Sequence, residues 1–246
     1  MARQPIEEPV SYIAEDKACG FVLAGGRSSR MGRDKALVEL QGCPLLEIAL
    51  ATLWAAGLPA RITGRRAPFA GIDPAIPDPI SNQLPESIPD LIPESGPLGG
   101  IHAALSASTA RWNLFLPVDM PLMPPSLLRY LLDRAELTAA PVTAVLLNGR
   151  LEPLPVVLDR AVLPHLVGLL ARGQRACRIA WQSIPGLLGA ELDAPAVETL
   201  RALGYCGDPH GLPPVHWFQS ANTPADLALL HRLTGHIPDR RSTHLL

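Results

Sequence analysis

The sequence is poor in cysteine and in aromatic residues, and it contains no long hydrophobic run. The only cysteines in 246 residues are Cys19, Cys43, Cys177 and Cys206, with no C-x-x-C pair. A structural zinc site needs closely spaced Cys or His ligands, so none is expected. Cys19 and Cys177 lie in apolar surroundings and are expected to be core residues. No apolar segment approaches the ~20 residues of a membrane-spanning helix.

An excess of charge of either sign is also missing. The 21 Lys and Arg residues nearly balance 23 Asp and Glu, and aromatic residues make up 4%. Without a basic stripe or an aromatic platform, we expect no nucleic-acid partner and no membrane partner. The first 17 residues are polar and acidic, unlike a signal peptide, so we expect a cytoplasmic protein with reduced thiols.

Proline is the residue in excess, with 27 copies where average usage gives about 12. Many fall in 59–97 and 209–214, whereas Pro124 and Pro125 are expected to start a helix. Apolar periodic segments flank these stretches, which favours ordered loops over domain linkers. The expected organisation is a flexible N-terminal arm (1–17), a single domain (18–232) and a C-terminal tail (233–246).

The hydrophobic pattern alternates between strands and helices along most of the chain. Strands are expected near 19–24, 60–63, 112–118, 142–147, 154–158 and 215–218. Helices are expected near 45–56, from 96, and near 125–135, 160–171, 175–181, 194–203 and after the capping residue Thr223. Strand, helix, strand units favour parallel pairing, so the pattern predicts a three-layer α/β/α sandwich on a mostly parallel sheet.

Residues 23–35, LAGGRSSRMGRDK, join the first expected strand to the first expected helix. Gly25 and Gly26 allow the backbone N–H groups to approach a phosphate. Four cations follow within nine positions, namely Arg27, Arg30, Arg33 and Lys35. The segment predicts a triphosphate clamp, with a glycine turn and a solvated basic loop as the alternative.

This segment resembles the signature L-A-G-G-x-S-x-R-M-G-x-D-K of nucleotidyltransferases related to molybdenum cofactor guanylyltransferase. The resemblance implies a Rossmann-like fold of the nucleotide-diphospho-sugar transferase type. It also implies that residues of this segment bind the nucleotide, with Lys35 close to the α-phosphate. These are Leu23, Ala24, Gly25, Gly26, Arg30 and Lys35.

Asp119 lies in LPVDMP at the carboxyl end of the strongest expected strand, where open α/β sheets place ligand-binding residues. A carboxylate there suits Mg²⁺, which prefers oxygen ligands. Capping of the following helix is the alternative role. The similar family carries C-D-x-P at this point with the Asp on the metal, and Val118 replaces the Cys here.

The segment IPDLIPESGPLGG resembles the second signature of that family, an Asp ahead of G-P-L-x-G. The resemblance implies that Gly96, Pro97 and Leu98 bind the nucleotide and that Asp90 recognises guanine. A carboxylate suits the N1–H and N2–H₂ donors of guanine. Glu86 and Glu94 are nearby alternatives to Asp90, and a loop followed by a helix start is the plain interpretation of the segment.

Two further segments complete the resemblance, and each departs from it. FQSANTPADL resembles F-x-N-x-N-T-P-x-D-L, which makes Asn222 a second metal ligand, while Ser220 stands in place of the first Asn. Capping of the last helix is the alternative for Asn222. In TGRRAPF, Arg65 stands where the family tends to have an Asn near the base, which weakens the case for guanine specifically.

The resemblance implies Mg²⁺-dependent transfer of GMP from GTP to molybdopterin with release of pyrophosphate. Lys35, Arg30 and Asp119 would be the catalytic residues, and LEPLPVVL at 151–158 would line the acceptor pocket. Partners would be GTP, molybdopterin or molybdenum cofactor, and other cofactor-biosynthesis proteins. The alternatives are a related transferase that uses CTP or another phosphorylated acceptor, and a regulator that binds a nucleotide without turnover.

Overall fold

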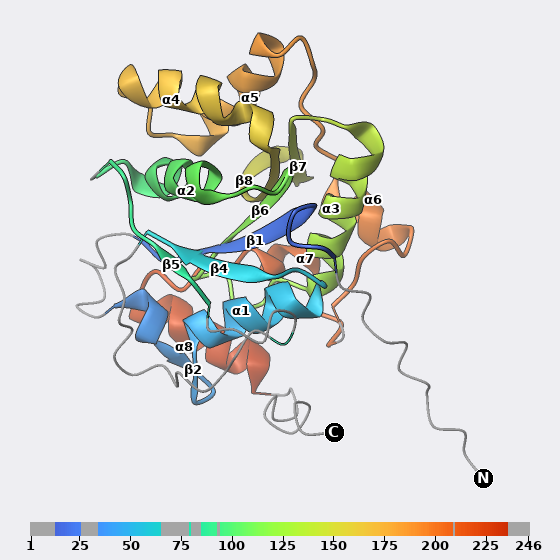
Figure 1. Ribbon diagram of the computed structural model, residues 1–246. Helices are drawn as coiled ribbons and strands as arrows, with labels where there is room; N and C mark the ends of the chain where they lie inside the picture. The colour runs from blue at the N-terminus through green and yellow to red at the C-terminus, as the bar shows by residue number, and fades with distance from the viewer. Residues whose placement is uncertain are drawn as a thin grey trace.

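The computed structural model describes residues 13–25, 34–64, 79, 85–92, 94–208 and 210–235. Its centre is a six-stranded sheet in the order β5-β4-β1-β6-β8-β7 (Figure 1). These strands are β1 (Ala18–Leu23), β4 (Ala60–Thr63), β5 (Ser87–Ile88), β6 (Trp112–Pro117), β7 (Val142–Leu147) and β8 (Arg150–Asp159). Within this sheet only β8 runs antiparallel to its neighbours. The expectation of a mostly parallel sheet is confirmed.

Helices cover both faces of this sheet. The α-helices of the described chain are α1 (Leu45–Ala55), α2 (Gly96–Ala107), α3 (Pro125–Thr138), α4 (Leu163–Ala171), α5 (Cys177–Leu187), α6 (Val197–Ala202), α7 (Pro214–Trp217) and α8 (Pro224–Thr234). Two 3-10 turns, η1 (Lys35–Leu37) and η2 (Arg160–Val162), and a small hairpin of β2 (Glu39–Leu40) and β3 (Cys43–Pro44) complete the structure.

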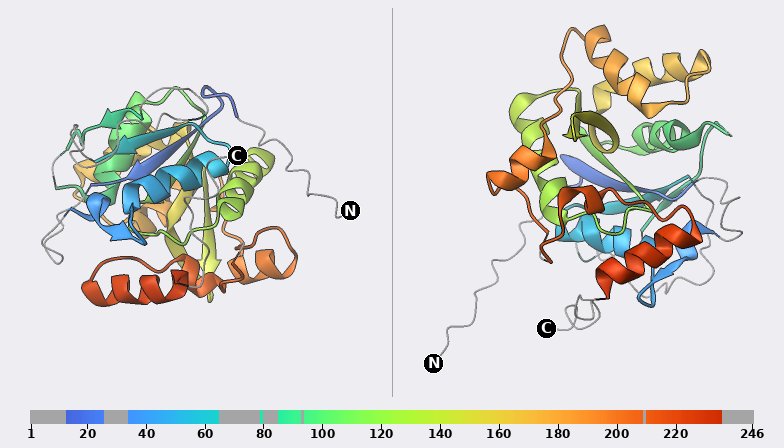
Figure 2. Two further views of the ribbon diagram at one scale, coloured as in Figure 1. Left: turned by 90° about the horizontal axis from the view of Figure 1, so that it is seen from below. Right: turned by 180° about the vertical axis from the view of Figure 1, so that it is seen from behind.

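The alternation of side chains along β1 divides the core into two layers. Ala18 and Val22 pack with α1, α3 and the C-terminal helices, whereas Phe21 and Leu23 pack with α2, α4 and α5. Successive strand residues point to opposite faces, so a strand buried on both faces reads as a continuous apolar run. Figure 2 shows α7 and α8 on the same side of the sheet as α1. The three-layer α/β/α sandwich is therefore confirmed.

The register brings the carboxyl ends of the central strands to one level. Leu23, the last residue of β1, lies opposite Thr63 of β4 and Pro117 of β6. The residues that follow these three strands therefore meet at one edge of the sheet. In open α/β sheets this edge is where ligands bind.

Most expected helices and strands agree with the structure, but the strand expected near 215–218 is wrong. That segment belongs to α7, which has Pro214 in its first turn. Proline has a fixed φ that suits the start of a helix and lacks the N–H that a sheet would need. The indole N–H of Trp217 donates to the carbonyl of Leu212 over 2.9 Å, which closes this turn.

Burial tests the expectation for two of the cysteines. Cys19 and Cys177 are both buried, as expected for core residues, and burial raises the pKa of the Cys177 thiol to about 12. None of the helices in the described part of the chain is long and apolar enough to span a bilayer.

The described ends of the chain pack against the sheet and its helices. The backbone N–H of Ile13 donates to the carbonyl of Gly57 over 3.1 Å, and Lys17 pairs with Glu136 over 2.9 Å. At the other end, α8 continues to Thr234, two residues past the expected boundary at 232. The division into arm, domain and tail stays a prediction.

Candidate active site

The site begins where the backbones of two glycines touch. Gly25 follows β1 and Gly64 follows β4; a Cβ added to Gly25 would lie 2.9 Å from the Cα of Gly64. A Cβ on Gly64, whose φ is +92°, would lie 2.7 Å from the Cα of Gly25. The N–H of Ala24 also donates to the carbonyl of Thr63 over 2.9 Å. This contact fixes the first residues of the glycine loop against the neighbouring strand end.

The rest of the expected phosphate clamp lies mainly outside the described residues. Gly26 and Arg30 fall there, as do Arg27 and Arg33, so their roles stay predictions. Leu23 and Ala24 have buried side chains that belong to the two core layers. Any nucleotide contact from these two residues would therefore use the backbone.

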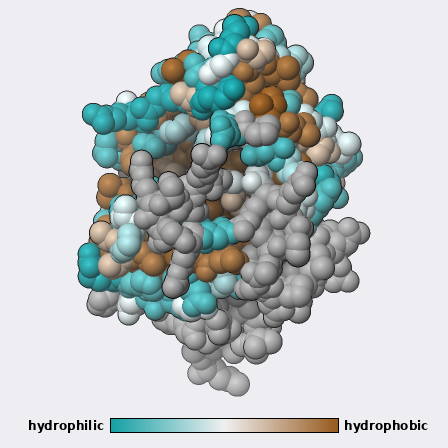
Figure 3. All heavy atoms as spheres, turned by 90° about the vertical axis from the view of Figure 1, so that its left-hand side faces the viewer, coloured by the Kyte–Doolittle hydropathy of each residue, from teal (hydrophilic) through white to brown (hydrophobic). Residues whose placement is uncertain are grey.

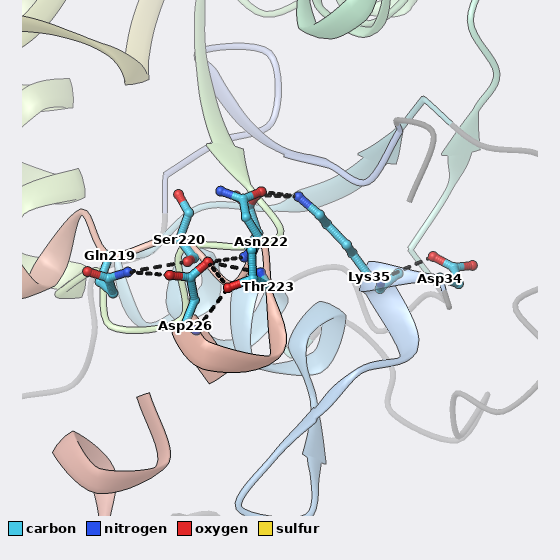
Figure 4. A network of polar contacts seen from close by, with 9 residues as sticks. Asp34, Lys35, Gln219, Ser220, Asn222, Thr223 and Asp226 are labelled. Carbon is cyan, nitrogen blue, oxygen red and sulfur yellow. Dashed lines mark hydrogen bonds and ion pairs between the residues drawn. The ribbon is translucent and has the colours of Figure 1, made fainter. Parts of the chain in front are cut away.

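Lys35 starts the 3-10 turn η1 and extends toward the carboxyl edge of the sheet. The Asp34 carboxylate caps this turn by accepting from the N–H of Ala36 over 3.1 Å. The Lys35 ammonium donates to Oδ2 of Asp119 over 3.0 Å and also to Oδ1 of Asn222. Figure 4 shows the side chains of Lys35 and Asn222 pointing toward one another from different segments.

The start of α8 holds Asn222 in this position. Thr223 is the N-cap of α8 and forms a reciprocal capping box with Asp226, so the expected capping hydroxyl is confirmed. The N–H of Asn222 donates to the Asp226 carboxylate over 3.2 Å, which leaves its side chain facing Lys35. One residue earlier, the N–H of Ala221 donates to the carbonyl of Asp119 over 2.9 Å.

Asp119 and Asn222 offer a divalent metal ion a suitable but incomplete set of ligands. Their side-chain oxygens both contact one cation, the Lys35 ammonium, and carboxylate and amide oxygens are ligands that Mg²⁺ accepts. The described residues include no cluster of three or more His, Cys, Asp or Glu side chains that could enclose a metal. Such an ion would need phosphate oxygens or water as further ligands.

Asp90 lies on the other side of the glycine contact, two residues after β5. Oδ1 of Asp90 is buried and has no hydrogen-bond partner in the described part of the chain. Burial raises the pKa of this carboxyl group. A Cβ on Gly100 of α2 would lie 3.5 Å from this oxygen, and the hydroxyl of Thr63 donates to the Gly100 carbonyl over 2.8 Å. A buried acceptor of this kind can accept hydrogen bonds from the N–H donors of a ligand.

The two alternatives to Asp90 lie differently. The Glu86 side chain is 63% exposed and pairs with Arg61 over 3.5 Å, so its charge is already matched at the surface. Glu94 is an exposed residue with a φ of +58° in the turn before α2. Of the three carboxylates, Asp90 alone has a buried oxygen without a described partner.

The GPLGG segment opens α2 beside Asp90. Gly96 has a φ of +59°, and Pro97 occupies the first turn of the helix. Leu98 is fully buried in the core, so only its backbone is open to a ligand. Gly99 has no room for a side chain, since a Cβ there would lie 2.8 Å from Cβ of Ser95.

Three sequence features of the predicted site remain, namely Ser220, Arg65 and the segment 151–158. Ser220 is half-buried beside Asn222, whereas Arg65 falls outside the described residues. The segment 151–158 belongs to β8. Figure 3 shows the side of the molecule on which β1 and β4 end, and its surface is hollowed between the α4–α5 part and the α1–α8 part.

Sequence reasoning missed some residues that shape this site. Gly64 and Thr63 position the glycine loop and α2, and Asp226 orients Asn222. A glycine directly after an apolar strand was the available signal for Gly64. The T-P-x-D spacing was the signal for the capping box that involves Asp226.

Comparisons with known proteins fit this geometry. A family model described as the MobA-like NTP transferase domain matches residues 20–183. The chain belongs to this family. A probable molybdenum cofactor guanylyltransferase of Deinococcus radiodurans is 35% identical over 211 residues, which cover 85% of this chain and 91% of that relative. A molybdenum cofactor guanylyltransferase of Xanthomonas euvesicatoria is 37% identical over 154 residues, 62% of this chain and 70% of that protein.

Solved structures support the fold of this MobA-like protein. Molybdopterin-guanine dinucleotide biosynthesis protein A from Archaeoglobus fulgidus has a TM-score of 0.67 at 24% identity and covers 88% of this chain and 98% of its own. 2-C-methyl-D-erythritol 4-phosphate cytidylyltransferase from Thermus thermophilus has a TM-score of 0.58 at 16% identity. The match covers 89% of this chain and 99% of that chain. The nucleotide-diphospho-sugar transferase fold is confirmed, and the family makes the chain a nucleotidyltransferase.

Proposed function

We propose that the protein transfers GMP from GTP to the terminal phosphate of molybdopterin and releases pyrophosphate. The similarity to molybdenum cofactor guanylyltransferases in two organisms supports this choice of reaction. The observation that carries it is the meeting of Lys35, Asp119 and Asn222. These residues come from three distant segments of the chain and converge on one point at the carboxyl edge of the sheet.

The proposed donor is GTP because Oδ1 of Asp90 has no hydrogen-bond partner among the described residues. The guanine edge presents N1–H and N2–H₂, and the buried Oδ1 of Asp90 needs donors of this kind. Cytosine presents one amino group next to acceptor atoms, which would face the same carboxylate. Asp90 therefore favours guanine over the CTP-dependent alternative.

In this reaction the protein mainly has to position the two substrates and neutralise phosphate charge. An acceptor phosphate oxygen attacks the α-phosphorus, a new P–O bond forms, and the bond to the bridging oxygen of the β-phosphate breaks. The electron pair leaves with pyrophosphate. The attacking phosphate is already ionised, so no general base is required. Lys35 would place its positive charge beside the α-phosphate as the charge on the leaving group grows.

A Mg²⁺ ion held by Asp119 and Asn222 would neutralise phosphate charge when bound with the nucleotide. These side chains supply oxygen donors only, as this hard cation prefers. The ammonium of Lys35, which both oxygens contact, would have to move away to admit the ion. This leaves the same lysine free to contact phosphate.

The proposal is tested by calorimetric titration of the purified protein with GTP, CTP, ATP and UTP, each with Mg²⁺. Selective GTP binding, followed by pyrophosphate release that requires molybdopterin, is the expected result. Preference for CTP would replace this proposal with a cytidylyltransferase. GTP binding without pyrophosphate release in the presence of molybdopterin would favour a regulator that binds the nucleotide without turnover.

A further inference from the structure

We propose that Glu152 is a specificity residue of the acceptor site, where its carboxylate accepts hydrogen bonds from the 2-amino and adjacent ring N–H groups of a pterin. This inference rests on the proposed function, because it assigns a residue to the acceptor of that reaction. Neither the motifs of the nucleotide site nor the contacts of Lys35 involve this residue.

The topology places Glu152 at the same edge of the sheet as Asp119. β8 runs antiparallel to β6, and Val156 of β8 lies opposite Phe115 of β6. The residues of β8 that precede Val156 therefore extend toward the edge at which Asp119 follows β6. Glu152 is four residues before Val156 and pairs with Val145 of β7. β6 and β8 are neighbours in the sheet, so Glu152 lies on the strand next to the one that Asp119 follows.

The Glu152 side chain is a half-buried acid. Within the described part of the chain its carboxylate forms no hydrogen bond or ion pair, and the residue lies between the buried residues Leu151 and Leu154 on β8. Burial raises the pKa of this carboxyl group, and the charge of Arg178 on α5 opposes that shift without an ion pair. A partly desolvated carboxylate is stabilised by hydrogen-bond donors, and a ligand with adjacent N–H groups would supply them here.

The surrounding structure holds this part of β8 in place. The indole N–H of Trp181 on α5 donates to the carbonyl of Pro153 over 2.8 Å, and Trp181 is fully buried. This bond anchors the residue next to Glu152 to the helix that also carries Arg178. The carboxylate is therefore presented by a strand that is fixed on one side by β7 and on the other by α5.

The strand order explains why this carboxylate would face the acceptor and not the donor nucleotide. Asp90 follows β5 and Asp119 follows β6, while Glu152 lies on β8, beyond β6 in the sheet. The β5 and β8 positions are four strand spacings apart, about 19 Å. A base at Asp90 and phosphates near Asp119 leave the β8 side for the molecule that attacks.

Guanine and pterin carry the same hydrogen-bonding edge, so a carboxylate can recognise either ring in the same way. Both rings contain a 2-amino-4-oxopyrimidine, so both present an amino group next to a ring N–H. A carboxylate accepts from these two donors through its two oxygens. One half-buried acid on each side of the phosphate site would thus recognise each end of the dinucleotide product.

The experiment is a fluorescence titration of the full protein with pterin and with lumazine, which has an oxygen in place of the 2-amino group. The variants are Glu152→Gln, which keeps the shape but removes the charge, and Glu191→Gln as a control at an exposed glutamate. We expect Glu152→Gln to weaken pterin binding about tenfold or more and to leave weak lumazine binding unchanged. Glu191→Gln should bind both ligands as the unaltered protein does, and thermal melting should show that both variants fold.

Two results would overturn the assignment: equal binding of pterin and lumazine by the unaltered protein, or unchanged pterin binding by Glu152→Gln. A GTP titration of the same samples separates this inference from the proposed function. GTP selectivity without pterin discrimination would refute only the role of Glu152. Pterin discrimination that depends on Glu152 without GTP binding would refute the guanylyl transfer and keep the pterin site.

Discussion

The two carboxylates of the proposed nucleotide site, Asp119 and Asp90, differ in what surrounds them. Asp119 contacts the Lys35 ammonium over 3.0 Å, so the charge of its carboxylate is balanced within the protein. Asp90 has a buried oxygen that accepts no hydrogen bond from the described residues, and a ligand with N–H donors would satisfy it. Substitutions at these two positions should therefore affect stability in different directions while both impair function.

Replacing Asp119 by Asn should abolish turnover and spare the fold. The side chains of Asp119 and Lys35 are 17% and 27% exposed, and a partly exposed pair contributes at most about 1 kcal/mol to stability. The loss of an electrostatic group at the reacting phosphates should lower kcat by about 100-fold or more. Pyrophosphate release and urea unfolding measure the two effects. Asp133→Asn, which removes an exposed partner of Arg129, is the control. More than a few per cent residual activity in Asp119→Asn would show that turnover does not need the negative charge of Asp119.

Replacing Asp90 by Asn should stabilise the protein at pH 7 and weaken its selectivity for GTP. Because burial raises the pKa of Asp90, the folded state binds more protons than the unfolded state between the two pKa values. Stability therefore falls as pH rises through that interval, and the cost persists at neutral pH. Asn carries no charge and avoids this cost. The advantage should shrink as pH falls toward the ordinary carboxyl range, and thermal melts at several pH values with GTP and ATP titrations would show both effects.

At the scale of elements, the glycine contact between the ends of β1 and β4 is the least tolerant feature of the site. Gly25→Ala places a Cβ 2.9 Å from the Gly64 backbone, which cannot move without disturbing β4. We expect a loss of about 1 to 3 kcal/mol in stability and loss of GTP binding. Gly186→Ala in α5 is the matched control, since its Cβ would meet nothing within 4 Å. This substitution should raise the free energy of unfolding by about 0.4 to 1 kcal/mol. Equal stability of the two variants would contradict this account.

Elements with strong periodicity were predictable from the sequence, while short ones were not. The long apolar strands β1 and β6 and the helix α1 lie within one or two residues of their expected ranges. β5 has two residues among prolines, so no period was available to detect it. The apolar VHWF run in 215–218 favoured a strand, but the proline at its start and a local indole contact make it helical.

At the scale of the whole molecule, the sequence motifs named candidate site residues one by one, but they could not indicate the contacts between them. Motif order indicated Lys35, Asp119 and Asn222, and general topology placed Asp119 at the edge of the sheet. No local pattern could show that Lys35 contacts a side chain 187 residues away, because that contact depends on how α8 packs. Gly64 was missed for the same reason, since its role exists only beside Gly25.

The strand order arranges the proposed functions in a row along one edge. Asp90 after β5 is at one end, the contact of Gly25 and Gly64 comes next, and then Asp119 after β6 and Glu152 on β8. α8 reaches the middle of this row through Asn222. The matched family region ends at residue 183, so α8 brings the site a residue from outside that region.

If Asp119 and Asn222 hold the proposed metal ion, Lys35 competes with that ion for their oxygens. Its ammonium contacts both oxygens that would hold Mg²⁺, and a divalent ion must displace it against like-charge repulsion. We expect Lys35→Met to bind Mn²⁺, a paramagnetic probe for Mg²⁺, about tenfold more tightly than the unaltered protein when no nucleotide is present. A tenfold change corresponds to about 1.4 kcal/mol, within the range of one nearby charge.

Electron paramagnetic resonance of free Mn²⁺ during titration gives the affinity directly. Lys17→Met removes the same charge from a lysine that pairs with Glu136, and it should leave Mn²⁺ binding unchanged. Adding Asp119→Asn to Lys35→Met should abolish the gain, because one of the two oxygens loses its charge. With GTP present, Lys35→Met should lower kcat more than it raises KM, since the lysine would then act on the reacting phosphate. If Lys35→Met binds Mn²⁺ no better than Lys17→Met does, the ammonium and the metal do not share one position, and the metal site must be sought away from Asp119 and Asn222.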